Sequence, residues 1–307
     1  MLAFPITPFS PTGEVDRAAV GTNASWLSAS GVRAIVAPSG TGEFFGLSPD
    51  EAVVVTEGTV RAAAGRVPVV AGVGVGPRVA ADFARRAEDA GAEAILVLPP
   101  YYSRPEPAAL VGYYEAVAGA TSLPLIPYQR DAAILTPILL DELLRRVPSV
   151  VAFKDGSGDI RLFQRLREHV RERWGEDRLV WLAGAGDDLA GPYYAAGADG
   201  FTSSLACFWP EAALELERLA RNGDFGRLRS YQSQVVRPFY ELRQRRPGFE
   251  VAVMKAAMEL LGHPAGPVRP PLANLGPGER EELAAILRRL DVPTRAVRAA
   301  RSAYSSM

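Results

Sequence analysis

The sequence predicts a (β/α)8 TIM barrel, a fold of the α/β class, followed by a C-terminal helical extension. Eight short apolar runs of strand length alternate with longer segments of helical period, which is typical of a parallel sheet with crossover helices. An open doubly wound sheet usually carries a glycine-rich fingerprint after its first strand, and none stands there. The glycines of residues 71–76 resemble one but follow the third run, and no acid for a ribose stands at the next strand end. A closed barrel is the better interpretation.

Local patterns define the predicted elements. The helix at residues 48–64 has the plainest start, because Ser48 can cap it, Pro49 suits its first turn and Glu51 completes a capping box. The predicted strands comprise residues 2–7, 31–38, 67–73, 94–98, 123–128, 150–154, 179–183 and 200–203, and the helices after them residues 210–221, 225–243, 250–261 and 277–290. These ranges place the barrel in residues 1–222 and the helical extension in residues 223–307.

The composition is that of an ordinary globular protein, with 34 Lys and Arg residues against 35 Asp and Glu residues. This balance gives no reason to expect a nucleic-acid partner. No run of 18 apolar residues predicts a transmembrane helix, and the first 15 residues lack the basic region of a signal peptide. The single cysteine, Cys207, cannot form an internal disulfide, which favours a reducing compartment. We therefore expect a cytoplasmic protein without a membrane or nucleic-acid partner.

Lys154 is the first candidate for chemistry, since barrel active sites are built at the carboxyl ends of the strands. It ends the apolar run at residues 150–154, so its stem would be buried and its amine would open into the barrel mouth. Desolvation lowers the pKa of an amine and frees a nucleophile for imine chemistry. An ion pair with Asp155 is the structural alternative, and it is the commoner role for a lysine at an arbitrary strand end.

Residues at the end of the preceding strand favour the catalytic role of Lys154 over the ion pair. Tyr128 ends that strand, so its phenol would lie near Lys154 and relay protons, although a tyrosine that merely covers the barrel core is an equal alternative. Arg130, two residues later, would bind a substrate carboxylate or remain a solvated loop charge.

A turn of small residues follows the second predicted strand. Gly40, Thr41 and Gly42 would bring backbone N–H groups and a hydroxyl close to a bound anion, which suits a carboxylate. A tight turn with Glu43 as a structural partner is an equal alternative.

Polar residues also end the last two predicted strands. Ser203 and Ser204 end the eighth strand and are candidates for binding substrate hydroxyls. Asp187 and Asp188 follow the seventh, where capping of a helix is at least as good an interpretation.

The two histidines stand away from the predicted strand ends. His169 falls within a helical segment and His263 near a helix end, so no histidine cluster for a metal is expected and a metal-dependent aldolase is disfavoured. Cys207 has no histidine and aspartate partners and is interpreted as a small buried hydrophobe.

These positions together resemble the dihydrodipicolinate synthase and N-acetylneuraminate lyase superfamily, from Phe4 to at least Leu275. The resemblance rests on the motif at residues 40–43, the turn at residues 100–102, Tyr128 and Lys154, in the family's order and spacing. It implies that Lys154 forms an imine, that Tyr128 relays protons, and that Thr41 with its flanking glycines binds a keto acid carboxylate. It also implies that Tyr102 enters the site of a neighbouring subunit in a homo-oligomer, commonly a dimer of dimers.

The local sequence narrows the resemblance further. Dihydrodipicolinate synthases usually have an arginine five residues after the tyrosine, whereas here Arg130 follows two residues after Tyr128. This short form is similar to the 5-dehydro-4-deoxyglucarate dehydratases, although Gln129 stands where that subgroup usually has Asn, and Tyr102 is more typical of the aldolase and synthase branches.

The resemblance implies loss of water and CO2 from 5-dehydro-4-deoxy-D-glucarate to give 2,5-dioxopentanoate, with Arg130 holding the far carboxylate of this sugar diacid. No cofactor is expected, because the lysine itself supplies the electron sink. A pyruvate-dependent aldolase or condensing synthase is the nearest alternative, and a keto acid sensor without turnover is a more remote one.

Overall fold

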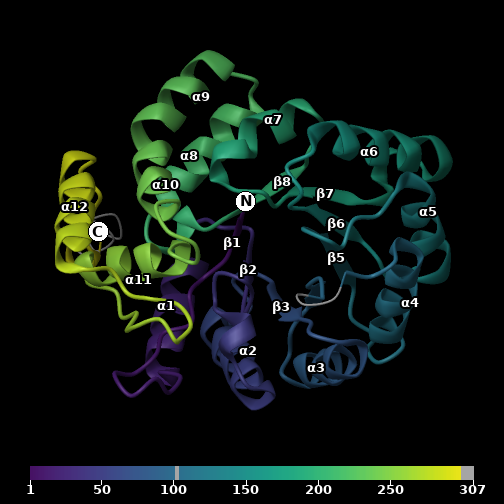
Figure 1. Cartoon of the computed structure of the whole chain (residues 1–307), viewed down its shortest axis with the longest axis horizontal. Coiled ribbons are helices and arrows are strands. Elements are labelled where there is room, and N and C mark those ends of the chain that lie inside the picture. The colour runs from purple at the N-terminus through teal and green to yellow at the C-terminus, as the bar shows by residue number, and fades with distance from the viewer. Residues whose placement is uncertain (101–103, 299–307) are drawn as a thin grey trace.

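Eight parallel strands close into a barrel in chain order, and β1 pairs with both β2 and β8. The computed structural model describes residues 1–100 and 104–298 (Figure 1). The strands are β1 Leu2–Ala3, β2 Ala34–Val36, β3 Val69–Val73, β4 Ala94–Val97, β5 Leu125–Gln129, β6 Ala152–Asp155, β7 Val180–Ala183 and β8 Gly200–Ser203. The predicted TIM barrel and each of its eight strands are confirmed.

Helices follow the strands around the outside of the barrel (Figure 1). They are α1 Arg17–Ser28, α2 Pro49–Ala63, α3 Pro77–Asp89, α4 Pro107–Ala118, α5 Pro137–Arg146, α6 Ile160–Trp174, α7 Ala190–Ala195 and α8 Pro210–Arg221. Helix α2 begins with the predicted capping box, in which the Glu51 N–H donates to Ser48 Oγ at 3.2 Å and the Ser48 N–H donates to Glu51 Oε2 at 2.9 Å.

The strand ends differ from prediction in ways that shape the site. β1 stops at Ala3, and the Phe4 N–H still donates to the Ser203 carbonyl at 3.2 Å, but Pro5 has no N–H with which to continue the ladder. β5 and β6 each run one residue further than predicted, with Tyr128 paired in register with Lys154. The two side chains therefore leave neighbouring strands at the same level.

The C-terminal helices pack beside the barrel next to α1 and α8 (Figure 1). They are α9 Phe225–Tyr231, α10 Arg237–Arg243, α11 Glu250–Leu260 and α12 Pro277–Arg289. The helix predicted at residues 225–243 is continuous, but a π-helical turn at Gln232–Val236 interrupts its regular winding. Pro238 accounts for this turn, because its ring clashes with the carbonyl four residues earlier and it donates no hydrogen bond.

Buried apolar side chains of the barrel and of the C-terminal helices belong to one hydrophobic cluster. The division of the chain after residue 222 stays a prediction. No helix in the described residues is long and apolar enough to cross a membrane.

Candidate active site

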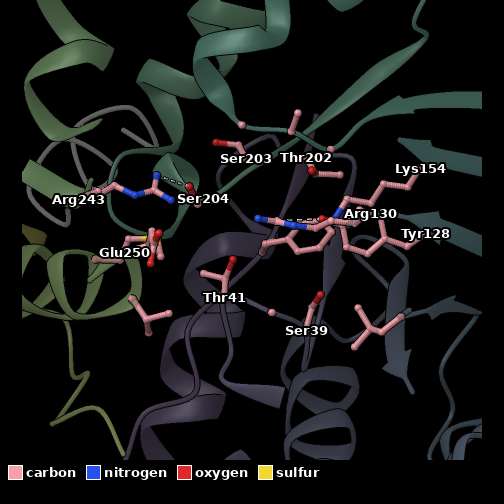
Figure 2. Close-up of a pocket in the computed structure, with 18 of the residues that line it drawn as sticks. Ser39, Thr41, Tyr128, Arg130, Lys154, Thr202, Ser203, Ser204, Arg243 and Glu250 are labelled. Atoms are coloured by element: carbon pink, nitrogen blue, oxygen red, sulfur yellow. Dashed lines mark hydrogen bonds between the residues drawn. The ribbon is translucent and has the colours of Figure 1, made fainter. Parts of the chain in front are cut away.

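A cavity of about 560 Å³ opens at the carboxyl ends of the barrel strands. Its walls come from the ends of the strands, the turn after β2 and the C-terminal helices (Figure 2). Seven of the predicted site residues line it, namely Gly40, Thr41, Tyr128, Arg130, Lys154, Ser203 and Ser204. Residues predicted from separate parts of the sequence thus meet in one place. Tyr102 lies outside the described residues.

Lys154 is buried, with a relative exposure of 4%, and its amine faces two aromatic rings. Nζ lies 3.7 Å from the ring centroid of Tyr128 and 4.2 Å from that of Phe4. Neither Asp155 nor any other carboxylate of the described residues forms an ion pair with it, since Asp155 accepts from the Ser157 N–H instead. Burial, and secondly the charge of Arg130, lower the pKa of Lys154 well below its usual value. The amine is therefore available as a nucleophile at lower pH than a solvated lysine.

Two glycines leave room for this arrangement. A Cβ at Gly184, just after β7, would lie 2.5 Å from Cε of Lys154, and one at Gly156, just after β6, would lie 2.7 Å from the Tyr128 hydroxyl. Real Cβ atoms essentially never approach so closely. Neither glycine stands out in the sequence, because its close neighbours are set only when the barrel closes.

We predict that Gly184→Ala lowers kcat about 100-fold, as expected when a reacting group is displaced by about 1 Å. The added methyl would displace the Lys154 side chain from its present position between β5 and β7. Steady-state kinetics and circular dichroism would separate this displacement from unfolding. Gly112→Ala is the matched control, because a Cβ at that helical glycine meets nothing within 4 Å; an equal loss in both variants would contradict the prediction.

The Tyr128 hydroxyl accepts a hydrogen bond from Nη1 of Arg130 at 3.1 Å. Burial raises the pKa of Tyr128, and the charge of Arg130 opposes that rise. The phenol therefore keeps its proton at neutral pH and can donate it to a bound substrate. Figure 2 shows Arg130, Tyr128 and Lys154 together at one end of the cavity.

The turn after β2 presents Ser39, Gly40 and Thr41 to the cavity. Gly42 lies beneath the turn, where its carbonyl accepts a hydrogen bond from Thr7 Oγ1 at 2.6 Å, and it does not line the cavity. Glu43 is fully buried and has a left-handed backbone conformation. These contacts fix the shape of the turn.

Glu43 is held by α11 and by the segment that follows it. Its Oε1 lies 2.6 Å from Nζ of Lys255 on α11, and its Oε2 accepts from the Arg269 N–H at 2.9 Å. Lys255 also donates to the Pro267 carbonyl at 2.7 Å. Burial lowers the pKa of Lys255 to about 8, although Glu43 opposes this change. The structural alternative for Glu43 is therefore the one observed.

Ser203 and Ser204 are joined in a hydrogen-bond network around Asp187. The buried Asp187 carboxylate accepts from Ser203 Oγ, from Ser204 Oγ at 3.2 Å and from the Tyr240 hydroxyl at 3.0 Å. Nη1 of Arg243 donates to Ser204 Oγ at 2.8 Å. Asp187 thus orients serines and tyrosine at the cavity wall instead of capping a helix with its side chain.

The C-terminal helices supply cavity residues that the sequence analysis missed. Arg243 ends α10 and Glu250 begins α11, and both line the cavity with Tyr240. Figure 2 shows Arg243 and Glu250 at the end of the cavity opposite Lys154. Periodicity predicts these helices but not how they pack on the barrel, so no pattern in the sequence pointed to them.

The histidines and the cysteine lie outside the cavity. His169 is on α6, and His263 stacks on Trp26 with ring centroids 4.0 Å apart. Cys207 is fully buried, and burial raises its pKa to about 12, which confirms its interpretation as a buried hydrophobe. In the described residues, no group of three or more His, Cys, Asp or Glu side chains is arranged to hold a metal ion.

The chain is similar over most of its length to proteins named probable 5-dehydro-4-deoxyglucarate dehydratase. One from Bradyrhizobium diazoefficiens is 38% identical over 292 residues, which cover 94% of this chain and 91% of the relative. One from Azotobacter vinelandii is 37% identical, with 94% of this chain and 95% of the relative covered. One from Streptomyces coelicolor is 38% identical, with coverages of 94% and 92%.

Solved structures of dihydrodipicolinate synthases have the same fold. That from Bacillus clausii superposes with a TM-score of 0.87 at 28% identity, covering 94% of this chain and 97% of the other. That from Oceanobacillus iheyensis gives a TM-score of 0.86 at 30% identity, with coverages of 94% and 96%. The model of the dihydrodipicolinate synthetase family matches residues 1–290. The chain is therefore a member of the dihydrodipicolinate synthetase family.

Proposed function

We propose that this protein is a Schiff-base-forming lyase that converts 5-dehydro-4-deoxy-D-glucarate to 2,5-dioxopentanoate, water and CO2. The buried Lys154 amine carries the proposal, because it faces the cavity with a lowered pKa and has no carboxylate partner among the described residues. The names of the relatives support the choice of substrate.

The first step joins Lys154 to the substrate. The neutral amine attacks the keto carbon, and the carbonyl oxygen leaves as water once it is protonated, which gives an iminium ion. Tyr128 is proposed to donate and recover protons in this step, a role supported by the 3.7 Å between its ring centroid and Nζ of Lys154. Thr41 and the N–H groups of its turn would bind the carboxylate next to the keto group.

The iminium ion then serves as the electron sink. Loss of a proton from the adjacent methylene gives an enamine, which expels the hydroxyl of the next carbon as water. The bond to the far carboxylate breaks, CO2 leaves, and its electron pair enters the conjugated iminium. Protonation and hydrolysis release 2,5-dioxopentanoate and restore Lys154.

Reduction with borohydride tests this proposal. The protein is incubated separately with pyruvate and with the sugar diacid, reduced, and measured by intact mass and peptide mapping. We expect an adduct on Lys154 with the diacid whose mass shows loss of water and CO2. An adduct with pyruvate and none with the diacid would overturn the proposal in favour of a pyruvate-dependent aldolase or a condensing synthase. No adduct with either compound would favour a keto acid sensor.

The charge of Arg130 should set the pH range of imine formation. It is the second cause of the low pKa of Lys154, so Arg130→Met raises that pKa and leaves less neutral amine at a given pH. As the pH is lowered, the rate of pyruvate adduct formation should therefore begin to fall at a higher pH in Arg130→Met than in the wild type. Arg145→Met is the control, because Arg145 pairs with Asp141 away from the cavity. An equal shift of this pH dependence in both variants, or no shift in either, would contradict the assigned role of Arg130.

The remaining expectations also belong to the proposed function. The resemblance implies a homo-oligomer in which Tyr102 enters a neighbouring subunit's site, and a small-molecule keto acid as partner. The single cysteine of the chain supports a cytoplasmic location. Gly42 is proposed to act by shaping the turn, and Ser203 and Ser204, at and just after the end of β8, by facing the substrate hydroxyls.

A further inference from the structure

We propose that Arg243 binds the far carboxylate of the substrate and so selects a diacid. This inference rests on the proposed function and names a residue that recognises the end of the substrate remote from the imine. It replaces Arg130 in that role, because Arg130 bonds to Tyr128 beside Lys154, whereas Arg243 stands at the opposite end of the cavity (Figure 2).

The hydrogen bonding of Arg243 is incomplete. Nη1 donates to Ser204 Oγ at 2.8 Å, while the buried Nε has no hydrogen-bond partner. Nε is closed off from solvent, so its missing bond shows incomplete pairing and is not itself the binding contact. Arg243 lines the cavity and its Nη2 forms no hydrogen bond with the described residues, so a carboxylate there can accept a charge-assisted bond from Nη2.

Arg243 also lacks a direct carboxylate partner. Arg245 and Arg246 follow just after α10 and pair with Glu282 and Glu279, each at 2.9 Å. Arg243 makes no ion pair with any carboxylate of the described residues, although Glu250 lies near it (Figure 2) and Ser204 links it to Asp187. Of these three arginines, the one that lines the cavity is therefore the one that no carboxylate contacts directly.

The guanidinium is held in place before any ligand binds. It stacks on the Tyr240 ring with its central carbon 4.5 Å from the centroid, and the Tyr240 hydroxyl is fixed by the buried Asp187. A planar guanidinium that is stacked and bonded on one side loses little freedom when it binds a carboxylate on the other. The arrangement suits a planar anion and offers little to a primary alcohol.

The test compares two ligands, namely the diacid, whose KM is measured in steady-state kinetics, and its analogue in which the far carboxylate is reduced to a primary alcohol. The alcohol cannot lose CO2, so its affinity is measured as a competitive inhibition constant. For Arg243→Met we expect KM for the diacid to rise on the order of 10- to 100-fold, the usual effect of losing a hydrogen bond to a charged group. We expect kcat to change less, because the far carboxylate leaves as CO2 and Arg243 stabilises it mainly before reaction. The wild type should bind the diacid more tightly than the alcohol, and this difference in affinity should disappear in Arg243→Met.

Matched variants separate this role from a structural one. Arg245→Met removes a neighbouring arginine outside the cavity and should leave KM unchanged. Glu250→Gln removes an anion that repels the substrate carboxylate and should lower KM; a KM raised as much as in Arg243→Met would mean that Arg243 acts by pairing with Glu250, and would overturn the inference. The borohydride adduct with pyruvate should persist in Arg243→Met, since pyruvate has no far carboxylate.

Failure of the proposed function and failure of the inference about Arg243 give different results. If the wild type does not convert the diacid, the proposed function fails. If the wild type converts it and Arg243→Met keeps both its KM and its preference for the diacid, the inference fails while the proposed function stands.

Discussion

Lys154→Ala should lower turnover of the sugar diacid on the order of 10⁴- to 10⁶-fold, as expected for loss of a covalent nucleophile. The methyl group cannot form the imine, and no second amine is placed to replace it, because Lys255 is paired with Glu43 beneath the turn. Neither keto acid should give an adduct at this position after borohydride reduction.

The conservative control for this variant is Lys154→Met, which keeps the length and bulk of the buried side chain but cannot form an imine. If loss of packing in the cavity were the cause of inactivity, Lys154→Met would retain activity. Turnover by either variant within 10-fold of the wild type would exclude imine chemistry at this residue. Binding of the product or of a keto acid measured by calorimetry would show that the cavity is intact.

Lys255→Met should destabilise the fold by about 3–5 kcal/mol, since it leaves the buried carboxylate of Glu43 without its counterion. The shift in melting temperature should be on the order of 10 °C. Burial already lowers the pKa of Lys255 to about 8, so the intact pair is not strongly stabilising. The expected loss arises from the charge left behind, and thermal or urea unfolding would measure it.

Two variants test whether the unpaired charge of Glu43 causes this loss of stability. Adding Glu43→Gln to Lys255→Met removes the orphaned charge and should restore most of the stability. Arg245→Met breaks an exposed pair with Glu282 and should cost less than about 1 kcal/mol. If the double variant is as unstable as Lys255→Met, the loss comes from packing of the lysine stem and not from the buried charge.

The sequence predicts the barrel and the imine end of the cavity because both follow from local order along the chain. Strand runs alternate with helices, and consecutive parallel strands are neighbours, so Tyr128 and Lys154 had to end close together. The opposite end of the cavity depends on how α10 and α11 dock on the barrel, which helical periodicity does not specify. Arg243 and Glu250 therefore become visible only in the structure.

The roles of Glu43 and of Ser203 and Ser204 depend on partners that lie far away in the sequence. The sequence names Glu43 as a candidate structural partner of the turn after β2, but its own partner, Lys255, lies far away in the chain. The serines after β8 gave no sign that their hydroxyls are bound to Asp187. The roles of these side chains follow from their contacts in the folded chain, which the residue types alone do not specify.

The π-helical turn at Gln232–Val236 controls which side chain reaches the substrate. Such a turn holds one residue more than an α-helical turn, and each residue advances an α-helix by about 100°. Without it, every residue from Arg237 onward would be rotated by roughly that angle, and Arg243 would point away from the cavity. Pro238 thus sets substrate choice from a distance, and loss or gain of a single residue in this turn would change selectivity while the chemistry at Lys154 stays the same.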